Sequence, residues 1–145
     1  MKKYNIVFFA LFIAVVLAGC QSTSLTGQVT STFTNHPKIT NLEPDKGAKN
    51  VALDVPIKIT FDREMDASTL NNRTISLQYA AEQGFNLNPF LNSKYTFEEN
   101  NYVLTITPPE NFLSHQKIEI IIRAGALDMN GKELSAGSYT FTTGE

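Results

Sequence analysis

Residues 57–61 read Ile-Lys-Ile-Thr-Phe, and this stretch decides the fold class because apolar and polar residues alternate along it. Alternation with a period of two, built from β-branched and aromatic residues, is typical of a β-strand with one buried face. The same pattern recurs around Ile39–Leu42, Thr74–Leu77, Tyr95–Phe97, Leu104–Ile106, Ile118–Ile122 and Tyr139–Phe141. The sequence therefore predicts an all-β sandwich of about seven strands.

Turn-forming residues separate these strands. Glu99–Asn101 predicts a hairpin, and residues 108–109, both proline, end a strand because neither can donate to a ladder. Asp128–Gly131 has turn chemistry, with a glycine able to adopt positive φ. The one helical signal lies at Glu64–Leu70, where we expect Asp66 to cap the helix or accept turn hydrogen bonds.

Several motifs follow one another in order between residues 37 and 144. They are Pro44 with Gly47-Ala48-Lys49-Asn50-Val51, then Phe61-Asp62-Arg63-Glu64-Met65-Asp66, then Leu104-Thr105-Ile106-Thr107-Pro108, then Asp128-Met129-Asn130-Gly131, and last Tyr139-Thr140-Phe141-Thr142-Thr143-Gly144. In type and order they resemble the bacterial Ig-like domain of the SbsA type. The resemblance implies an immunoglobulin-like sandwich over residues 37–145. The chain departs from the family in the stretch after Leu77, which is longer and more aromatic than expected.

The first twenty residues read as an export signal. A positive opening, Met1–Asn5, precedes an apolar run, Ile6–Leu17. That run is shorter than the roughly 20 residues of a membrane-spanning helix and has the length of a secretory signal. Leu17-Ala18-Gly19-Cys20 resembles the lipobox of bacterial lipoproteins, which implies cleavage after residue 19 and lipidation of Cys20. The alternative is an uncleaved anchor that ends in an ordinary cysteine.

The segment that follows has the composition of a tether. Residues 20–36 are rich in serine and threonine and carry no charged side chain. Such a segment buries too little apolar area to offset its ordering entropy, so we interpret it as a flexible spacer. The alternative is that Val29–Phe33 adds an edge strand to the domain that begins at residue 37.

The net charge of the chain bears on its partners, and the residue after Cys20 bears on the membrane to which it is attached. The whole chain has a net charge of −2, and loss of residues 1–19 removes Lys2 and Lys3, leaving −4. A mildly acidic surface repels phosphate backbones, so we expect no nucleic-acid partner. We expect attachment to a cell-envelope membrane through acyl chains on Cys20. Gln21, where inner-membrane lipoproteins tend to have aspartate, favours the outer membrane in a Gram-negative cell.

No group of residues indicates catalysis, so we expect no catalytic residues, no cofactor and no enzyme activity. Ser114 and His115 are adjacent, and adjacent residues rarely reach the geometry of a nucleophile and its base. The single cysteine is assigned to lipid, which excludes thiolate zinc sites. Asp62, Glu64, Asp66 and Asp128 could supply oxygen ligands to calcium, but capping and turn roles explain them better, and we expect no metal site.

The segment Tyr79–Asn92 is the strongest candidate for recognition. It combines Tyr79, Phe85 and Phe90 with several asparagines, and long loops on rigid sandwiches often bind partners. Aromatic rings beside amides suit a sugar or a peptide. The alternative is that Phe85, Leu87 and Phe90 cover the edge of the sandwich as core residues.

The sequence as a whole predicts a non-enzymatic, membrane-anchored binding or structural module of the cell envelope, with a protein or polysaccharide partner. Two alternatives stay open. The chain could be a small lipoprotein subunit that assembles into a secretion or envelope machine, or a module for carbohydrate attachment. Fold alone does not choose among them, since sandwiches host many functions.

Overall fold

The computed structural model describes residues 35–80, 90 and 92–145. The expectations for the signal segment, Cys20, most of the tether, Val29–Phe33, Phe85 and Leu87 fall outside these residues. The described part contains seven strands, so the all-β prediction is confirmed. In chain order they are Ile39–Glu43 (β1), Ile57–Phe61 (β2), Ile75–Tyr79 (β3), Lys94–Glu98 (β4), Val103–Thr107 (β5), Lys117–Ile122 (β6) and Gly137–Thr142 (β7).

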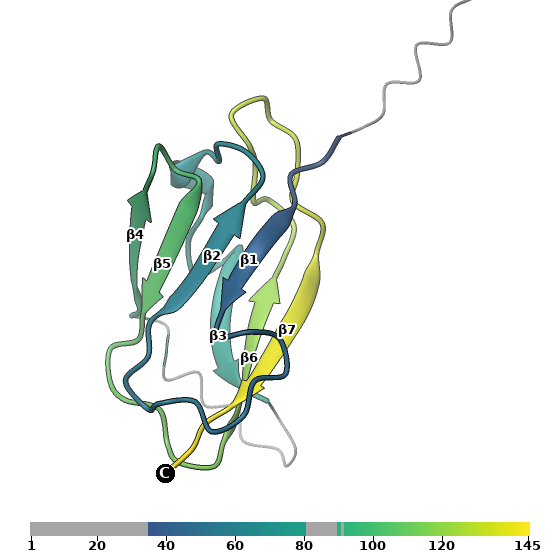
Figure 1. The fold of residues 1–145 in the computed structure, drawn as a ribbon. Coiled ribbons are helices and arrows are strands. Elements are labelled where there is room, and N and C mark those ends of the chain that lie inside the picture. The colour runs from purple at the N-terminus through teal and green to yellow at the C-terminus, as the bar shows by residue number, and fades with distance from the viewer. Residues whose placement is uncertain (1–34, 81–89, 91) are drawn as a thin grey trace, which may run out of the picture. The chain divides into compact units, whose positions relative to one another are not determined.

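The strands form two antiparallel sheets packed face to face (Figure 1). One sheet has the order β1-β2-β5-β4 and the other the order β3-β6-β7. In the first, Ile59 of β2 lies opposite Leu104 of β5. In the second, Ile120 of β6 lies opposite Leu77 of β3 and Tyr139 of β7. This is the layered sandwich that the alternating pattern predicts.

The core lies between the sheets and is built from the alternate residues that face inward. Ile57, Ile59 and Phe61 are at most 2% exposed, whereas Lys58 and Thr60 between them are only half-buried. Burying each such apolar side chain contributes roughly 1.5–3 kcal/mol. The same alternation places Ile118, Ile120 and Ile122 of β6 in the core. With no disulfide among the described residues, this burial is the main source of stability.

The helical signal at Glu64–Leu70 is realised only as a short 3₁₀ turn, Ala67–Thr69 (η1). Met65 is fully buried and forms a bridge with Asp128, so the chain there follows a strand-like path and not a helical one. Asp66 caps the turn as expected: its carboxylate accepts hydrogen bonds from the Ser68 amide at 3.0 Å and the Ser68 hydroxyl at 2.6 Å.

The turn predictions are also confirmed. Glu99–Asn101 links β4 to β5, and all three residues adopt positive φ. The strand β5 ends at Thr107, directly before the two prolines. In the turn Asp128–Gly131, the glycine has φ +72°, and its amide donates to the Asp128 carbonyl at 2.9 Å.

One free sheet edge is covered by a connecting segment that was not predicted as a strand. Residues 47–51 run beside β7, where the Gly47 amide donates to the Thr140 carbonyl at 2.6 Å and the Thr142 amide donates to the Ala48 carbonyl at 2.8 Å. Val51 completes the cover by donating to Thr142 at 3.1 Å. Covering an edge in this way blocks it from pairing with another strand.

Candidate functional site

The loops of the sandwich gather at its two ends, which we name here (Figure 1). We call the end at which β1 begins the proximal end; it contains residues 35–38, 62–66 and 127–133. The opposite end, with residues 44–56, 80, 108–116 and 143–145, is the distal end. All described residues belong to one compact unit, residues 32–145.

At the proximal end an arginine ties the N-terminal segment to the domain. The Arg63 guanidinium bonds both carboxylate oxygens of Asp62 at 3.0 Å and donates to the Asn35 carbonyl at 2.7 Å. Asp62 in turn accepts from the Lys38 amide at 2.9 Å. The hydrogen bond from Arg63 lowers the pKa of Asp62. His36 adds a contact from Nδ1 to the Glu133 carbonyl at 2.8 Å. The chain therefore joins the domain by several fixed contacts.

Three of the four acidic residues weighed as calcium ligands, Asp62, Asp66 and Asp128, accept hydrogen bonds from protein groups. The Asp128 side chain is buried, and its Oδ1 accepts from the amides of Asn130 and Lys132 at 2.9 and 2.8 Å. Its Oδ2 lies 3.5 Å from Arg63 Nη1. Within the described residues, no three His, Cys, Asp or Glu side chains are grouped so that they could hold a metal ion.

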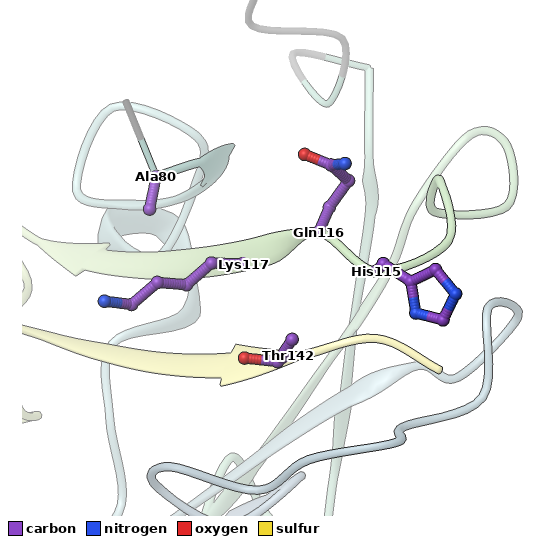
Figure 2. Close-up of a pocket in the computed structure, with 5 residues that line it drawn as sticks. All are labelled: Ala80, His115, Gln116, Lys117 and Thr142. Carbon is purple, nitrogen blue, oxygen red and sulfur yellow. The ribbon is translucent and has the colours of Figure 1, made fainter. Parts of the chain in front are cut away.

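At the distal end a pocket of about 270 Å³ opens on the outer face of the three-stranded sheet (Figure 2). Its lining residues are Ala80, His115, Gln116, Lys117 and Thr142. Lys117 precedes the buried Ile118, so its side chain lies on the outer face. Thr142 is opposite Lys117, and the Ala80 amide donates to the Lys117 carbonyl at 2.8 Å. The three residues thus form the last row of the sheet, which floors the pocket.

The loop that closes this pocket is held by a buried threonine. The Thr143 hydroxyl accepts from the Gln116 amide at 2.8 Å and donates to the Leu113 carbonyl at 2.7 Å. Thr143 is 1% exposed. His115 adopts φ +57°, and its amide donates to Gly144 at 3.0 Å. Because a left-handed histidine is uncommon, these bonds hold the loop in a conformation that it would seldom adopt alone.

A row of aromatic rings supports the same end from inside. The ring centroids of Tyr79 and Phe90 are 5.0 Å apart, those of Phe90 and Phe112 are 5.3 Å apart, and those of Phe112 and Phe141 are 5.7 Å apart. The last two pairs meet edge to face, a favourable arrangement for aromatic quadrupoles. Tyr79 also fixes the loop, since its hydroxyl accepts from the Leu113 amide at 3.1 Å.

Two of the three residues predicted to bind a partner lie in the described part of the chain, and their surroundings differ. Phe90 is 2% exposed and packs in the core, as the core alternative expected for it. Tyr79 is half-buried at the end of β3, beside the loop that borders the pocket. Phe85 lies outside the described residues, and its role stays a prediction. Of the three, only Tyr79 is placed by the structure near an open surface.

The pocket offers hydrogen-bond donors and one permanent positive charge. Lys117 supplies an ammonium group, Gln116 an amide, Thr142 a hydroxyl and His115 an imidazole, and the lining contains no carboxylate. These groups suit a ligand that presents hydroxyl, carbonyl or carboxylate oxygens. In the part of the chain that the structure describes, no helix is long and apolar enough to cross a bilayer.

Sequence reasoning missed this pocket. Lys117 lies on β6 and Thr142 on β7, Ala80 directly follows β3, and no local motif connects the three. The available signal was the strand assignment itself, because pairing β6 with both neighbours brings Lys117 beside Thr142. The alternation places Thr143 on the same side as Tyr139 and Phe141, but it does not predict the hydrogen bonds that the Thr143 hydroxyl makes.

Comparisons with known proteins agree with this architecture. The sequence model of a protein family described as a bacterial Ig-like domain matches residues 22–143. None of the curated proteins compared with the chain is significantly similar to it in sequence.

Solved structures share the fold at low sequence identity. PcoC, a methionine-rich copper resistance protein from Escherichia coli, superposes with a TM-score of 0.57 at 18% identity over 74% of this chain and 98% of PcoC. CopC from Methylosinus trichosporium OB3b gives 0.55 at 18% identity over 75% of this chain and 94% of CopC. The S-layer protein SbsC gives 0.55 at 18% identity over 75% of this chain, which spans only 14% of that SbsC structure. At such identities the likeness extends to the fold alone.

Proposed function

Because this chain belongs to the family of bacterial Ig-like domains, we propose that it is a non-enzymatic, lipid-anchored module of the cell envelope that binds a partner at its distal end. The observation that carries the proposal is the separation of the two ends. The N-terminal segment joins the domain at the proximal end (Figure 1), and the polar pocket is lined by residues of the distal end (Figure 2). A tether on the first leaves the second accessible.

The anchor is supported by the sequence around Cys20. Small residues directly before a cysteine, after a positive opening and a short apolar run, provide what a lipoprotein signal peptidase requires. Each buried CH₂ of an acyl chain adds about 0.8 kcal/mol of membrane affinity, so two or more chains hold a protein stably. Gln21 favours the outer membrane in a Gram-negative cell.

A rigid distal end supports the binding role. Thr143 and Tyr79 both bond the backbone of the loop beside the pocket, so a ligand would meet a loop whose backbone is already in position. Preorganisation of this kind raises affinity because less entropy is lost on binding. The lining donates hydrogen bonds and carries the charge of Lys117, which fits an oxygen-rich partner, either a protein loop with carboxylates or a polysaccharide.

The anchor is tested by the mass and partitioning of the mature protein. The full gene is expressed in a bacterial host, with a Cys20→Ser variant as control. We expect the natural chain to lack residues 1–19, to carry the added mass of acyl chains on Cys20 and to enter the detergent phase. The variant should keep residues 1–19 and carry no acyl mass. A natural protein that keeps Met1 and an unmodified thiol would refute the anchor.

The binding end is tested by photo-crosslinking in cells. A photoreactive amino acid is placed at Lys117 in the pocket or, as a matched control, at the exposed Lys132 of the proximal end. We expect a discrete adduct from position 117 and none from position 132. Its mass distinguishes a protein from a polysaccharide, and recovery of one multiprotein complex would favour the assembly-subunit alternative. Equal labelling at both positions, or labelling only at 132, would contradict a distal binding site.

A further inference from the structure

The free edges of the two sheets differ in how regular they are and in how far described residues cover them. Within the described residues, β7 is covered by residues 47–51, and the Ile75 carbonyl of β3 accepts a hydrogen bond from the Tyr95 hydroxyl at 2.6 Å. β1 has an irregular register between Ile39 and Asn41. β4 pairs regularly with β5 along its whole length, and no described residue bonds the backbone of its outer side.

The direction of the backbone groups on this edge follows from the neighbouring strands. The Phe61 amide donates to the Tyr102 carbonyl, so residues 102, 104 and 106 point toward β2, and residues 103, 105 and 107 point toward β4. Opposite residues in antiparallel strands bond in alternate pairs. Lys94, Thr96 and Glu98 therefore bond to β5, and Tyr95 and Phe97 present their N–H and C=O groups on the outer side.

The sequence of β4 is complementary to itself when it is reversed. It reads Lys-Tyr-Thr-Phe-Glu from 94 to 98, with a positive and a negative end, two aromatic residues and a threonine at the centre. We propose that β4 is a homodimer interface, in which it pairs antiparallel with β4 of a second copy about a two-fold axis that passes midway between the two Thr96 residues. The two four-stranded sheets then become one continuous sheet of eight strands.

This register gives each residue of β4 a favourable neighbour on the second copy. Tyr95 lies opposite the partner's Phe97, where the two residues exchange both backbone hydrogen bonds, and symmetry repeats the pair for a total of four bonds. Lys94 lies opposite the partner's Glu98 on the outer face, and again at the symmetric position. Thr96 lies opposite its own copy. Opposite charges, aromatic pairs and threonine pairs are all favourable cross-strand neighbours.

The charges also select against other pairings. A parallel arrangement in register would place Lys94 beside Lys94 and Glu98 beside Glu98, which is repulsive. A slip of one residue would bring the outer-face side chains of one copy opposite the core-facing side chains of the other. Lysine and glutamate at the ends of an edge strand normally guard it against aggregation. Here their order along the strand also favours a reversed copy over a parallel one.

The interface is small and the pairing weak in solution, because it consists of one five-residue strand from each copy, well below a stable interface of about 1,200–2,000 Å². The anchoring in the proposed function is what makes it effective, since confinement to a membrane raises the local concentration of copies. The inference rests on that proposal for its strength and not for its geometry.

Disulfide trapping tests the register directly. Thr96→Cys is made in the full chain, with Thr60→Cys as matched control on the same outer face of the central strand β2, and the unsubstituted chain as baseline for Cys20. The Cα atoms of a non-hydrogen-bonded pair lie about 4.5 Å apart, within the range of a disulfide. We expect mild oxidation in membranes to link Thr96→Cys into a dimer at least about tenfold faster than Thr60→Cys.

A second experiment reverses the charges at the two ends of β4. Either Lys94→Glu or Glu98→Lys, added to Thr96→Cys, should slow crosslinking about tenfold, because two attractive pairs become repulsive. The double exchange Lys94→Glu/Glu98→Lys should restore the rate. Equal crosslinking at positions 96 and 60, or no restoration by the double exchange, would overturn the proposal. The oxidation is repeated on the concentrated, detergent-solubilised chain, where crosslinking through position 96 does not depend on lipidation of Cys20. Failure of the proposed anchor can therefore be told apart from failure of the proposed dimer.

Discussion

Replacement of Phe90 by alanine is the sharpest test of how the segment after β3 is used. The ring is 2% exposed and lies between Tyr79 and Phe112, with centroid distances of 5.0 and 5.3 Å. Phe112 continues the contact to Phe141 on β7. The Phe90→Ala substitution therefore removes the ring that connects the end of β3 to the aromatic residues beneath the pocket.

The expected loss follows from this burial. Phenylalanine-to-alanine changes in protein cores cost about 3–5 kcal/mol, because the transfer free energy is lost and a cavity remains. That is a large share of the roughly 5–15 kcal/mol by which a domain is stable. For a compact unit of residues 32–145, each kcal/mol corresponds to about 4 °C, so Tm should fall by about 12–20 °C.

The measurement is urea unfolding followed by far-ultraviolet circular dichroism and tyrosine fluorescence, since the chain has five tyrosines and no tryptophan. Leu113→Ala is the matched control: it removes a large apolar side chain that is 63% exposed, and the expected change is within about 0.5 kcal/mol. Phe90→Leu keeps part of the volume and should lose about 1–2 kcal/mol. It provides a folded variant if Phe90→Ala does not fold.

The reasoning fails if Phe90→Ala costs less than about 1 kcal/mol while the control behaves as expected. The ring would then not be a core residue, and the binding role predicted for Phe90 from the sequence would regain support. The same pair of measurements extends to Phe85. Loss of the crosslinked partner without loss of stability would identify a binding residue, and loss of stability would identify a core residue.

Three further predictions concern single positions. Gly131→Ala should lower the free energy of unfolding, measured in urea, by about 1–2 kcal/mol, because Gly131 has φ +72°. Gly137→Ala should be neutral or slightly stabilising, because Gly137 has no positive φ and an added Cβ has no atom within 4 Å. Equal effects of the two substitutions would refute the conformational explanation. Burial raises the pKa of Tyr95 to about 12, from about 10 when unfolded. The neutral Tyr95 hydroxyl therefore stabilises the fold below pH 10, and this stabilisation is lost as the pH rises through 12. The urea midpoint of the unsubstituted chain should fall between these pH values, and Tyr95→Phe should reduce that fall. An equal fall in the variant would contradict the assignment. The pKa of Asp62 is lowered, chiefly by its hydrogen bond from Arg63, so this carboxylate stabilises the fold above its unfolded pKa and stops doing so as the pH falls through the lowered value. In Arg63→Met, NMR titration should show the pKa of Asp62 nearer its usual range, and no movement would exclude the guanidinium as the cause.

The strands could be predicted from the sequence because the alternation of apolar and polar residues lies within each strand. Alternation in residues 57–61 follows from one buried and one exposed face, and the pattern holds whichever strands become neighbours. Asp66 was predictable as a cap for the same reason, since the groups that it bonds lie within two residues. The helical signal before it was misleading because Met65 is fixed by Asp128, a contact across the fold.

The site was less predictable because its groups are brought together by topology. Arg63 meets Asn35 and Asp128 only after β1 and the β6–β7 connection pack beside it. The pocket likewise requires the pairing of β6 with both of its neighbours. Short-range patterns do not show which distant residues will meet. The sequence of β4 does show its complementarity with a reversed copy, and this matters because no described residue bonds the outer side of the strand.

The two proposals together restrict how a dimer could sit on one membrane. A two-fold axis that passes between the two Thr96 residues and is normal to the sheet reverses the strand direction, so the proximal ends of the two copies point in opposite directions. Two equivalent anchors reach the same bilayer only if the axis lies along the membrane normal. The strands then run parallel to the membrane, and the two pockets face sideways at opposite ends of the dimer. Copies standing upright would instead require one tether to run back along the whole sandwich, which would make the two anchors inequivalent.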